Sequence, residues 1–270
     1  MLLGSASVRA KVTAIVVLGA ALFARRADAY RPFDGTDADV AELGSFELEM
    51  GPAHFYAQGD RNYLIAPATV LNFGIFRNTE LVIDMQNFVA LGAVPTGDPR
   101  VQLLDTDVLV KHVFREGILQ GKTGLSIAAE GGPLVPEING TDAFGASLDV
   151  ILSYRWDWGT VHFNEWGEYT REHTADLWSG VIVEGPHEWI LRPVMEMYYE
   201  RDFTINQTES LLVGAIWTLK ESFVLDAGVR GARVGAENAA EVRLGFTWAL
   251  PMWEPTENAA ATRALGRRSM

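Results

Sequence analysis

The feature that most constrains the fold of this chain is the alternation of apolar and polar residues over unusually long segments. Residues 142–156 show it best. Their even positions are apolar or aromatic from Phe144 to Trp156, whereas their odd positions are mostly small, polar or charged. A period of two is typical of a β-strand with two chemically different faces. The segment is far longer than the usual strand of about 5–6 residues.

The same alternation recurs along the chain and predicts about twelve strands. They lie near residues 45–57, 62–76, 79–91, 102–116, 122–134, 142–156, 159–172, 175–185, 188–201, 207–220, 222–233 and 238–250. Tight connections such as Arg77-Asn78 alternate with longer ones such as residues 92–101. An even number of strands joined in this way is typical of an up-and-down barrel. We therefore predict an all-β fold, a transmembrane antiparallel up-and-down β-barrel.

Alternation alone does not say which face of the barrel meets water. Three features favour a membrane. The strands reach the length of about 9–11 residues that a tilted strand needs to cross a bilayer. Aromatic residues gather at the ends of the apolar stripes, as Trp156 and Trp248 do. The polar stripes carry Gly, Ser, Thr and charges of both signs, which suits an enclosed interior. The alternative is a soluble barrel with these charges outside.

The first 29 residues match a secretory signal peptide. Arg9 and Lys11 precede the apolar run 12–24, and Ala27-Asp28-Ala29 is a small-residue cleavage site. An uncleaved anchor is the alternative, because Arg25 and Arg26 follow the apolar run. The run is too short to cross a bilayer as a helix. Export combined with membrane strands predicts a location in the bacterial outer membrane, with contacts to outer-membrane lipid and to the barrel-assembly machinery.

Composition excludes several classes of function. The chain has no cysteine, so it has no disulfide and no thiolate site. Its formal net charge of −13 argues against a nucleic-acid partner, which requires a basic face. The five histidines are scattered and form none of the paired zinc motifs, so we predict neither a metal nor another cofactor.

Enzyme activity is predicted to be absent. The chain has no G-x-S-x-G motif. Outer-membrane phospholipases are twelve-stranded barrels with a Ser/His/Asn site, and His162-Phe-Asn164 is the nearest match in this sequence. Because no neighbouring H-x-S-type sequence accompanies it, we interpret His162 as a residue of the barrel interior or of the interface. A lipid-modifying enzyme stays as a third hypothesis.

The segment Arg31-Pro-Phe-Asp-Gly-Thr-Asp-Ala-Asp-Val-Ala-Glu-Leu-Gly-Ser-Phe-Glu-Leu-Glu49 resembles the opening of an outer-membrane β-barrel family labelled "MetA-pathway of phenol degradation". Residues 72–83, 222–230 and 241–248 resemble its second and closing hairpins, so the resemblance covers about residues 31–250. It implies a channel or transporter for small, aromatic or apolar solutes. The chain departs from many outer-membrane barrels at its end, where residues 251–270 continue past the last strand as a tail.

The parity of the strands predicts which charged residues face the interior. The acids among them are Glu47, Glu49, Asp84, Asp105, Asp107, Glu130, Asp149, Glu168, Glu196, Glu200, Asp226 and Glu241. The bases are Lys111, Arg115, Arg155, Arg192, Arg230 and Arg243. Two interpretations stay open: a polar conduit that favours cations, or a network of ion pairs that fills a closed barrel.

Residues 30–44 precede the first strand as a periplasmic segment, either a partial plug in the mouth of the barrel or a solvated leader. The leading functional hypothesis is passive uptake of a small solute through the barrel, residues 45–250. The alternative is a structural or surface-binding barrel with a plugged interior.

Overall fold

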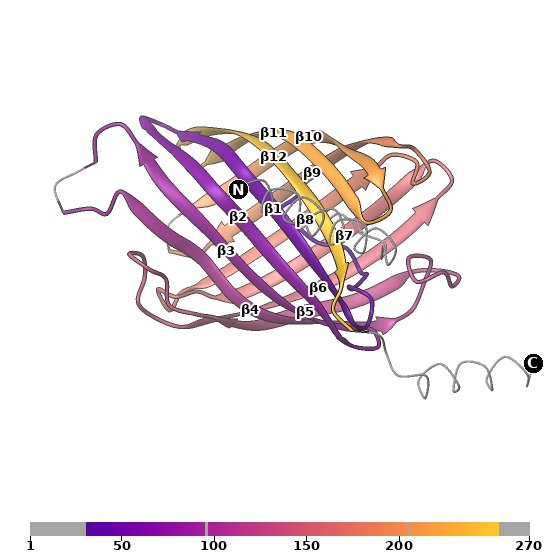
Figure 1. Cartoon of the computed structure of the whole chain (residues 1–270). Helices are drawn as coiled ribbons and strands as arrows, with labels where there is room; N and C mark the ends of the chain where they lie inside the picture. Colours follow the sequence, from indigo (N-terminus) through magenta and orange to yellow (C-terminus); the bar gives the residue numbers. More distant parts are fainter. Residues whose placement is uncertain (1–30, 95–96, 205, 254–270) are drawn as a thin grey trace, which may run out of the picture.

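The computed structural model describes residues 31–94, 97–204 and 206–253. The predicted signal peptide and nearly all of the predicted tail lie outside the described residues. Twelve antiparallel strands form one closed barrel in which each strand pairs with its neighbours in sequence and β1 pairs with β12 (Figure 1). No helix in the described part of the chain has the length and apolar character of a membrane span. The predicted fold is confirmed.

The strands agree closely with the predicted segments. They are β1 (Ser45–Gln58), β2 (Arg61–Phe76), β3 (Thr79–Leu91), β4 (Val101–Arg115), β5 (Ser126–Leu134), β6 (Gly145–Trp156), β7 (Gly159–Tyr169), β8 (Ala175–Glu184), β9 (Leu191–Asp202), β10 (Gln207–Lys220), β11 (Phe223–Val234) and β12 (Glu237–Pro251).

The outer surface of the barrel is apolar and its interior is polar. In β12, Leu244 is 53% exposed, whereas its neighbour Arg243 is 7% exposed. The other strands show the same pattern, in which buried carboxylates alternate with exposed aliphatic side chains along the chain. Hydrocarbon offers no hydrogen-bond partner to an open sheet edge, and closure between β1 and β12 removes that edge. The barrel is therefore built to span a membrane with its apolar face toward lipid.

The connections differ between the two ends of the barrel. We call the end at which β1 begins and β12 finishes the terminal end, where Ser45 pairs with Pro251. Three connections at this end are two residues long, whereas residues 116–125 and residues 185–190 form longer connections there. The predicted strand near 122–134 therefore starts late, at Ser126, because residues 117–124 close a turn through hydrogen bonds such as Ile118 N–H to Gly124 O.

The acidic residue Glu165 in β7 faces outward, at the same parity as the exposed residues Phe163 and Tyr169. The strand register continues without a shift through its pairs with Val150 and Ser179. The Ser179 hydroxyl donates a hydrogen bond of 2.5 Å to the Glu165 carboxylate. This bond partly satisfies a group that is otherwise expensive to place on a lipid-facing surface.

Candidate functional site

The barrel interior holds nearly all of the charged residues that strand parity predicts there. Eight are buried: Glu47, Glu49, Lys111, Asp149, Glu196, Asp226, Glu241 and Arg243. Nine are half-buried: Asp84, Asp105, Asp107, Glu130, Arg155, Glu168, Arg192, Glu200 and Arg230. Arg115 departs from the prediction and is exposed. It is the last residue of β4, beyond a register shift after Val113, so it lies at the rim and not in the interior.

Residues 31–44, which we call the inner segment, run along the inside of the barrel. The segment has no helix or strand of its own. The segment contacts all twelve strands in turn. Its path begins at β1, where His54 lies beside Arg31, and finishes at β2, where Gly74 bonds to Gly44. The wall residues that show this path are His54, Gly74, Glu80, Lys111, Ala128, Ser153, Asn164, Trp178, Glu196, Ile216, Gly228 and Arg243.

Side chains of the barrel wall form hydrogen bonds with the main chain in the middle of the inner segment. The Glu196 carboxylate accepts hydrogen bonds from Asp34 N–H at 3.0 Å and from Gly35 N–H at 2.7 Å. Asn164 Oδ1 accepts from Thr36 N–H at 2.6 Å, and Asn164 Nδ2 donates to Thr36 O at 2.7 Å. These bonds satisfy peptide groups that would otherwise be enclosed without a partner.

Further main-chain contacts fix the two ends of the segment. Toward β1, the Glu80 carboxylate accepts a hydrogen bond from Ala41 N–H at 2.6 Å. Gln120, in the connection that follows β4, donates to Ala38 O at 2.6 Å. At the other end, Arg243 donates to Pro32 O at 2.7 Å.

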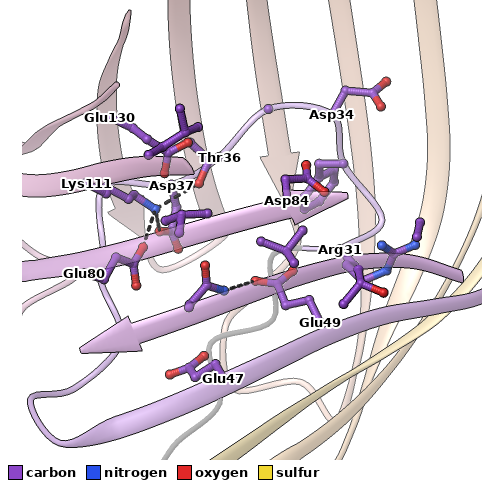
Figure 2. A pocket seen from close by; sticks show the side chains of 18 of the residues that line it. Arg31, Asp34, Thr36, Asp37, Glu47, Glu49, Glu80, Asp84, Lys111 and Glu130 are labelled. Atoms are coloured by element: carbon purple, nitrogen blue, oxygen red, sulfur yellow. Dashed lines mark hydrogen bonds and ion pairs between the residues drawn. The ribbon is translucent and has the colours of Figure 1, made fainter. Parts of the chain in front are cut away.

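Ion pairs add to these main-chain contacts (Figure 2). Lys111 Nζ donates to Thr36 Oγ1 at 2.9 Å and lies 3.6 Å from both Asp37 and Glu80. Arg243 lies 2.7 Å from Asp34 and 2.9 Å from Glu241. Each buried base is thus shared between a carboxylate of the segment and one of the wall, which compensates part of the cost of burying both charges.

Apolar side chains of the segment occupy two small clusters on the wall. Phe33 packs against the cluster of Val194, Ile216, Val224 and Ala249. Ala38 belongs to a cluster with Val113, Ala128 and Ile151, against which Val40 packs.

Inward-facing glycines let the segment approach the wall closely. A Cβ added to Gly228 would lie 3.2 Å from Pro32, and one added to Gly245 would lie 2.5 Å from Arg31 Nε. Glycine in a strand often marks such an approach of another segment.

A cavity of about 190 Å³ remains between the inner segment and the wall formed by β1–β5 and β12. Its lining is rich in acids: Asp34, Asp37, Asp39, Glu47, Glu49, Glu80, Asp84, Glu130 and Glu241. Three bases, Arg31, Lys111 and Arg243, also line it. Figure 2 shows several of these carboxylates around the segment. The lining of this cavity thus carries nine acidic side chains against three arginine or lysine side chains.

A second group of charged residues lies toward the end of the barrel opposite the terminal end, around Arg171 in the connection between β7 and β8. Arg171 lies 2.7 Å from Asp107 and 3.8 Å from Glu137, and it also donates to Thr106 O and Val135 O. This arginine ties the connection after β7 to β4 and to the connection after β5. It leaves most of the nearby acids, Asp84 and Asp105 among them, without an arginine or lysine ion pair in the described part of the structure.

His162 lies in a chain of hydrogen bonds in the interior. Its Nδ1 is 2.8 Å from Ser153 Oγ, and its Nε2 is 3.0 Å from Glu184 Oε1. Ser153 Oγ also accepts a hydrogen bond from Ala38 N–H at 2.9 Å. The set resembles a hydrolytic triad in composition, but Ser153 and His162 are at most 1% exposed and do not line the cavity. The arrangement instead ties the inner segment to β6, β7 and β8.

The predicted set of interior residues leaves out three residues that hold the segment: Glu80, Ser153 and Asn164. Glu80 has the inward parity of Asp84, Ser153 that of Asp149, and Asn164 that of Glu168, so parity could have found them. The contact of each with a particular residue of the segment carries no local signal in the sequence. Among the described residues, no group of three or more His, Asp or Glu side chains is arranged to hold a metal ion.

Comparisons with known proteins agree with the fold. No family model matches the chain, and no curated protein matches it at a significant level, so membership of the family named above is not shown. The crystal structure of the COG4313 outer membrane channel from Pseudomonas putida F1 aligns with a TM-score of 0.58 and 8% identity, over 81% of this chain and 100% of that chain. The KdgM porin aligns with a TM-score of 0.47 and 10% identity, over 76% and 98%. The fold is that of an outer-membrane barrel, and together with the apolar outer face it places this chain in the bacterial outer membrane.

Proposed function

We propose that this protein is a passive outer-membrane channel for small hydrophilic solutes, with a preference for cations, and that the inner segment sets its low conductance. The observation that supports this most is the acid-rich cavity of about 190 Å³ inside a closed barrel with an apolar exterior. Aromatic or apolar cargo follows from the family resemblance, but the acid-rich polar lining of the cavity favours charged and polar solutes.

The cation preference follows from the balance of charges along the cavity. A cation entering it meets carboxylates of the wall, such as Glu47 and Glu49, and of the segment, such as Asp39. The same carboxylates repel an anion. Rings and clusters of acidic side chains produce cation selectivity in channels by this mechanism.

The test is a planar-bilayer recording with the purified full chain under a salt gradient. The proposal predicts small discrete conductance steps and a reversal potential of the sign expected for cations. Heat-modifiable gel mobility establishes that the same sample is folded. Folded protein that gives neither conductance steps nor swelling of solute-loaded liposomes would exclude the channel and leave the structural barrel with a plugged interior.

A matched pair of variants tests the source of the selectivity. Asp84→Asn removes a carboxyl group from the cavity lining, at a residue whose Oδ1 has no hydrogen-bond partner among the described residues. Asp60→Asn removes a charge from the exposed turn between β1 and β2. We expect Asp84→Asn to move the reversal potential toward zero and Asp60→Asn to leave it unchanged. Equal effects would show that the cavity lining does not set the selectivity.

A further inference from the structure

The barrel wall recognises the inner segment chiefly by its peptide groups. Five N–H groups of the segment, those of residues 34, 35, 36, 38 and 41, are hydrogen-bonded to side chains of the wall. Three of its carbonyl groups, those of residues 32, 36 and 38, accept hydrogen bonds from the wall or from Gln120. Every polypeptide carries these groups, so a peptide that follows the same bent path presents them whatever its side chains.

Two of these contacts resemble the way a peptide ligand is held. Asn164 contacts both the N–H and the carbonyl of Thr36, as a neighbouring strand would. Glu196 accepts from two successive N–H groups, those of Asp34 and Gly35. Specificity for side chains comes from two places, the apolar cluster that receives Phe33 and the small cluster that contains Ala38. Main-chain contacts that give affinity and pockets that give specificity are the general pattern of peptide recognition.

From these contacts we infer that the barrel interior is a binding site for an oligopeptide that follows the bent path of the inner segment, with residues 31–41 as its tethered occupant. A free peptide with an aromatic residue followed by small residues, and with few positive charges beyond its first residue, binds there once the tethered occupant has left. The inference deepens the proposed function, on which it rests, by naming oligopeptides as a class of solute that the lumen recognises.

The tether explains why a free peptide does not displace the segment from the intact chain. Residues 42–44 link the occupant directly to β1, so its local concentration in the lumen is on the order of millimolar. A free peptide at micromolar concentration cannot compete with it. The test therefore has to cut the tether after the complete chain has folded.

Glu42 is exposed, which makes the peptide bond after it a suitable place for a protease recognition sequence. The full chain with this insertion is folded in detergent, cut and washed, and a fluorescent peptide of residues 31–42 is then added. Fluorescence anisotropy should show saturable binding to the cut barrel and none to the uncut one. A segment that cannot be washed out of the cut barrel, or a washed barrel that does not bind the peptide saturably, would overturn the inference.

N-methylated peptides test whether the barrel wall recognises the main chain of the peptide. N-methylation at Gly35 or at Ala38 removes an N–H that is bonded to the wall, and each should weaken binding about tenfold. N-methylation at Val40 is the matched control, because that N–H is bonded to Asp39 within the segment. Equal affinities of the three peptides would overturn main-chain recognition. Binding is measured without ion flow, so a silent bilayer combined with saturable binding would exclude the channel and keep the peptide site.

Discussion

Asn164 on β7 contacts Thr36 of the inner segment through both halves of its amide, with bonds of 2.6 and 2.7 Å. Replacing Asn164 with Leu removes both bonds and leaves the peptide groups of Thr36 without partners inside the barrel. Each buried group left unpaired costs about 1–3 kcal/mol. We expect Asn164→Leu to lower the free energy of unfolding by about 2 kcal/mol, measured by tryptophan fluorescence in urea, and to raise the single-channel conductance.

The matched variant Asn164→Asp keeps the acceptor for Thr36 N–H but loses the donor to Thr36 O. It should fall between the wild type and Asn164→Leu in both measurements. Unchanged conductance in Asn164→Leu would show that this contact does not hold the segment in the lumen.

Lys111 is 3% exposed and forms ion pairs with both Asp37 of the segment and Glu80 of β3. Removal of one partner from a buried ion pair typically costs about 3–5 kcal/mol, because the remaining charges are left uncompensated. Lys111→Met should therefore destabilise the barrel strongly and increase its cation selectivity. The double variant Lys111→Met/Glu80→Gln should recover part of the stability in the same urea titration, and a double variant less stable than Lys111→Met would contradict this account.

Val213 lies in the middle of β10 and is 51% exposed on the outer face. An arginine at the midplane of a bilayer costs about 2–4 kcal/mol, and near an interface it costs about 0–1 kcal/mol. We expect Val213→Arg to reduce stability in lipid vesicles by about 3 kcal/mol. Val101→Arg, at the first residue of β4, is the control and should have little effect. A reversed order of the two effects would show that the outer face does not meet hydrocarbon as described.

Ser153 and His162 are expected to hold the inner segment and not to hydrolyse lipid. Ser153 is buried beneath Ala38, with which it forms a 2.9 Å hydrogen bond. Ser153→Ala should leave any background hydrolysis of phospholipid in detergent micelles unchanged while it destabilises the segment. Loss of a measurable lipase activity in Ser153→Ala or His162→Ala would instead support the enzyme hypothesis.

Most of the fold could be predicted from the sequence because a barrel strand carries its own signal. Parity alone places Glu241 inside and Leu244 outside, and the structure agrees. The boundaries failed where local turn chemistry decided them. Residues 122–125 continue an apparent alternation, but the turn closed by Gly117 and Gly124 delays β5 to Ser126.

The path of the inner segment could not be predicted, because it depends on contacts between residues far apart in the chain. Thr36 and Asn164 are 128 positions apart, and Pro32 and Arg243 are 211 positions apart. Parity shows that Asn164 faces inward, but nothing near it in the sequence indicates that a peptide will lie beside it. The periplasmic location of the segment's side of the barrel stays a prediction.

Single-channel recording on the chain with the protease site after Glu42 tests the central claim most directly. We predict small cation-selective steps from the uncut protein, a severalfold larger conductance after cutting and washing, and a return to small steps when the peptide of residues 31–42 is added. The same conductance before and after removal of the segment, with the barrel still folded, would contradict that claim.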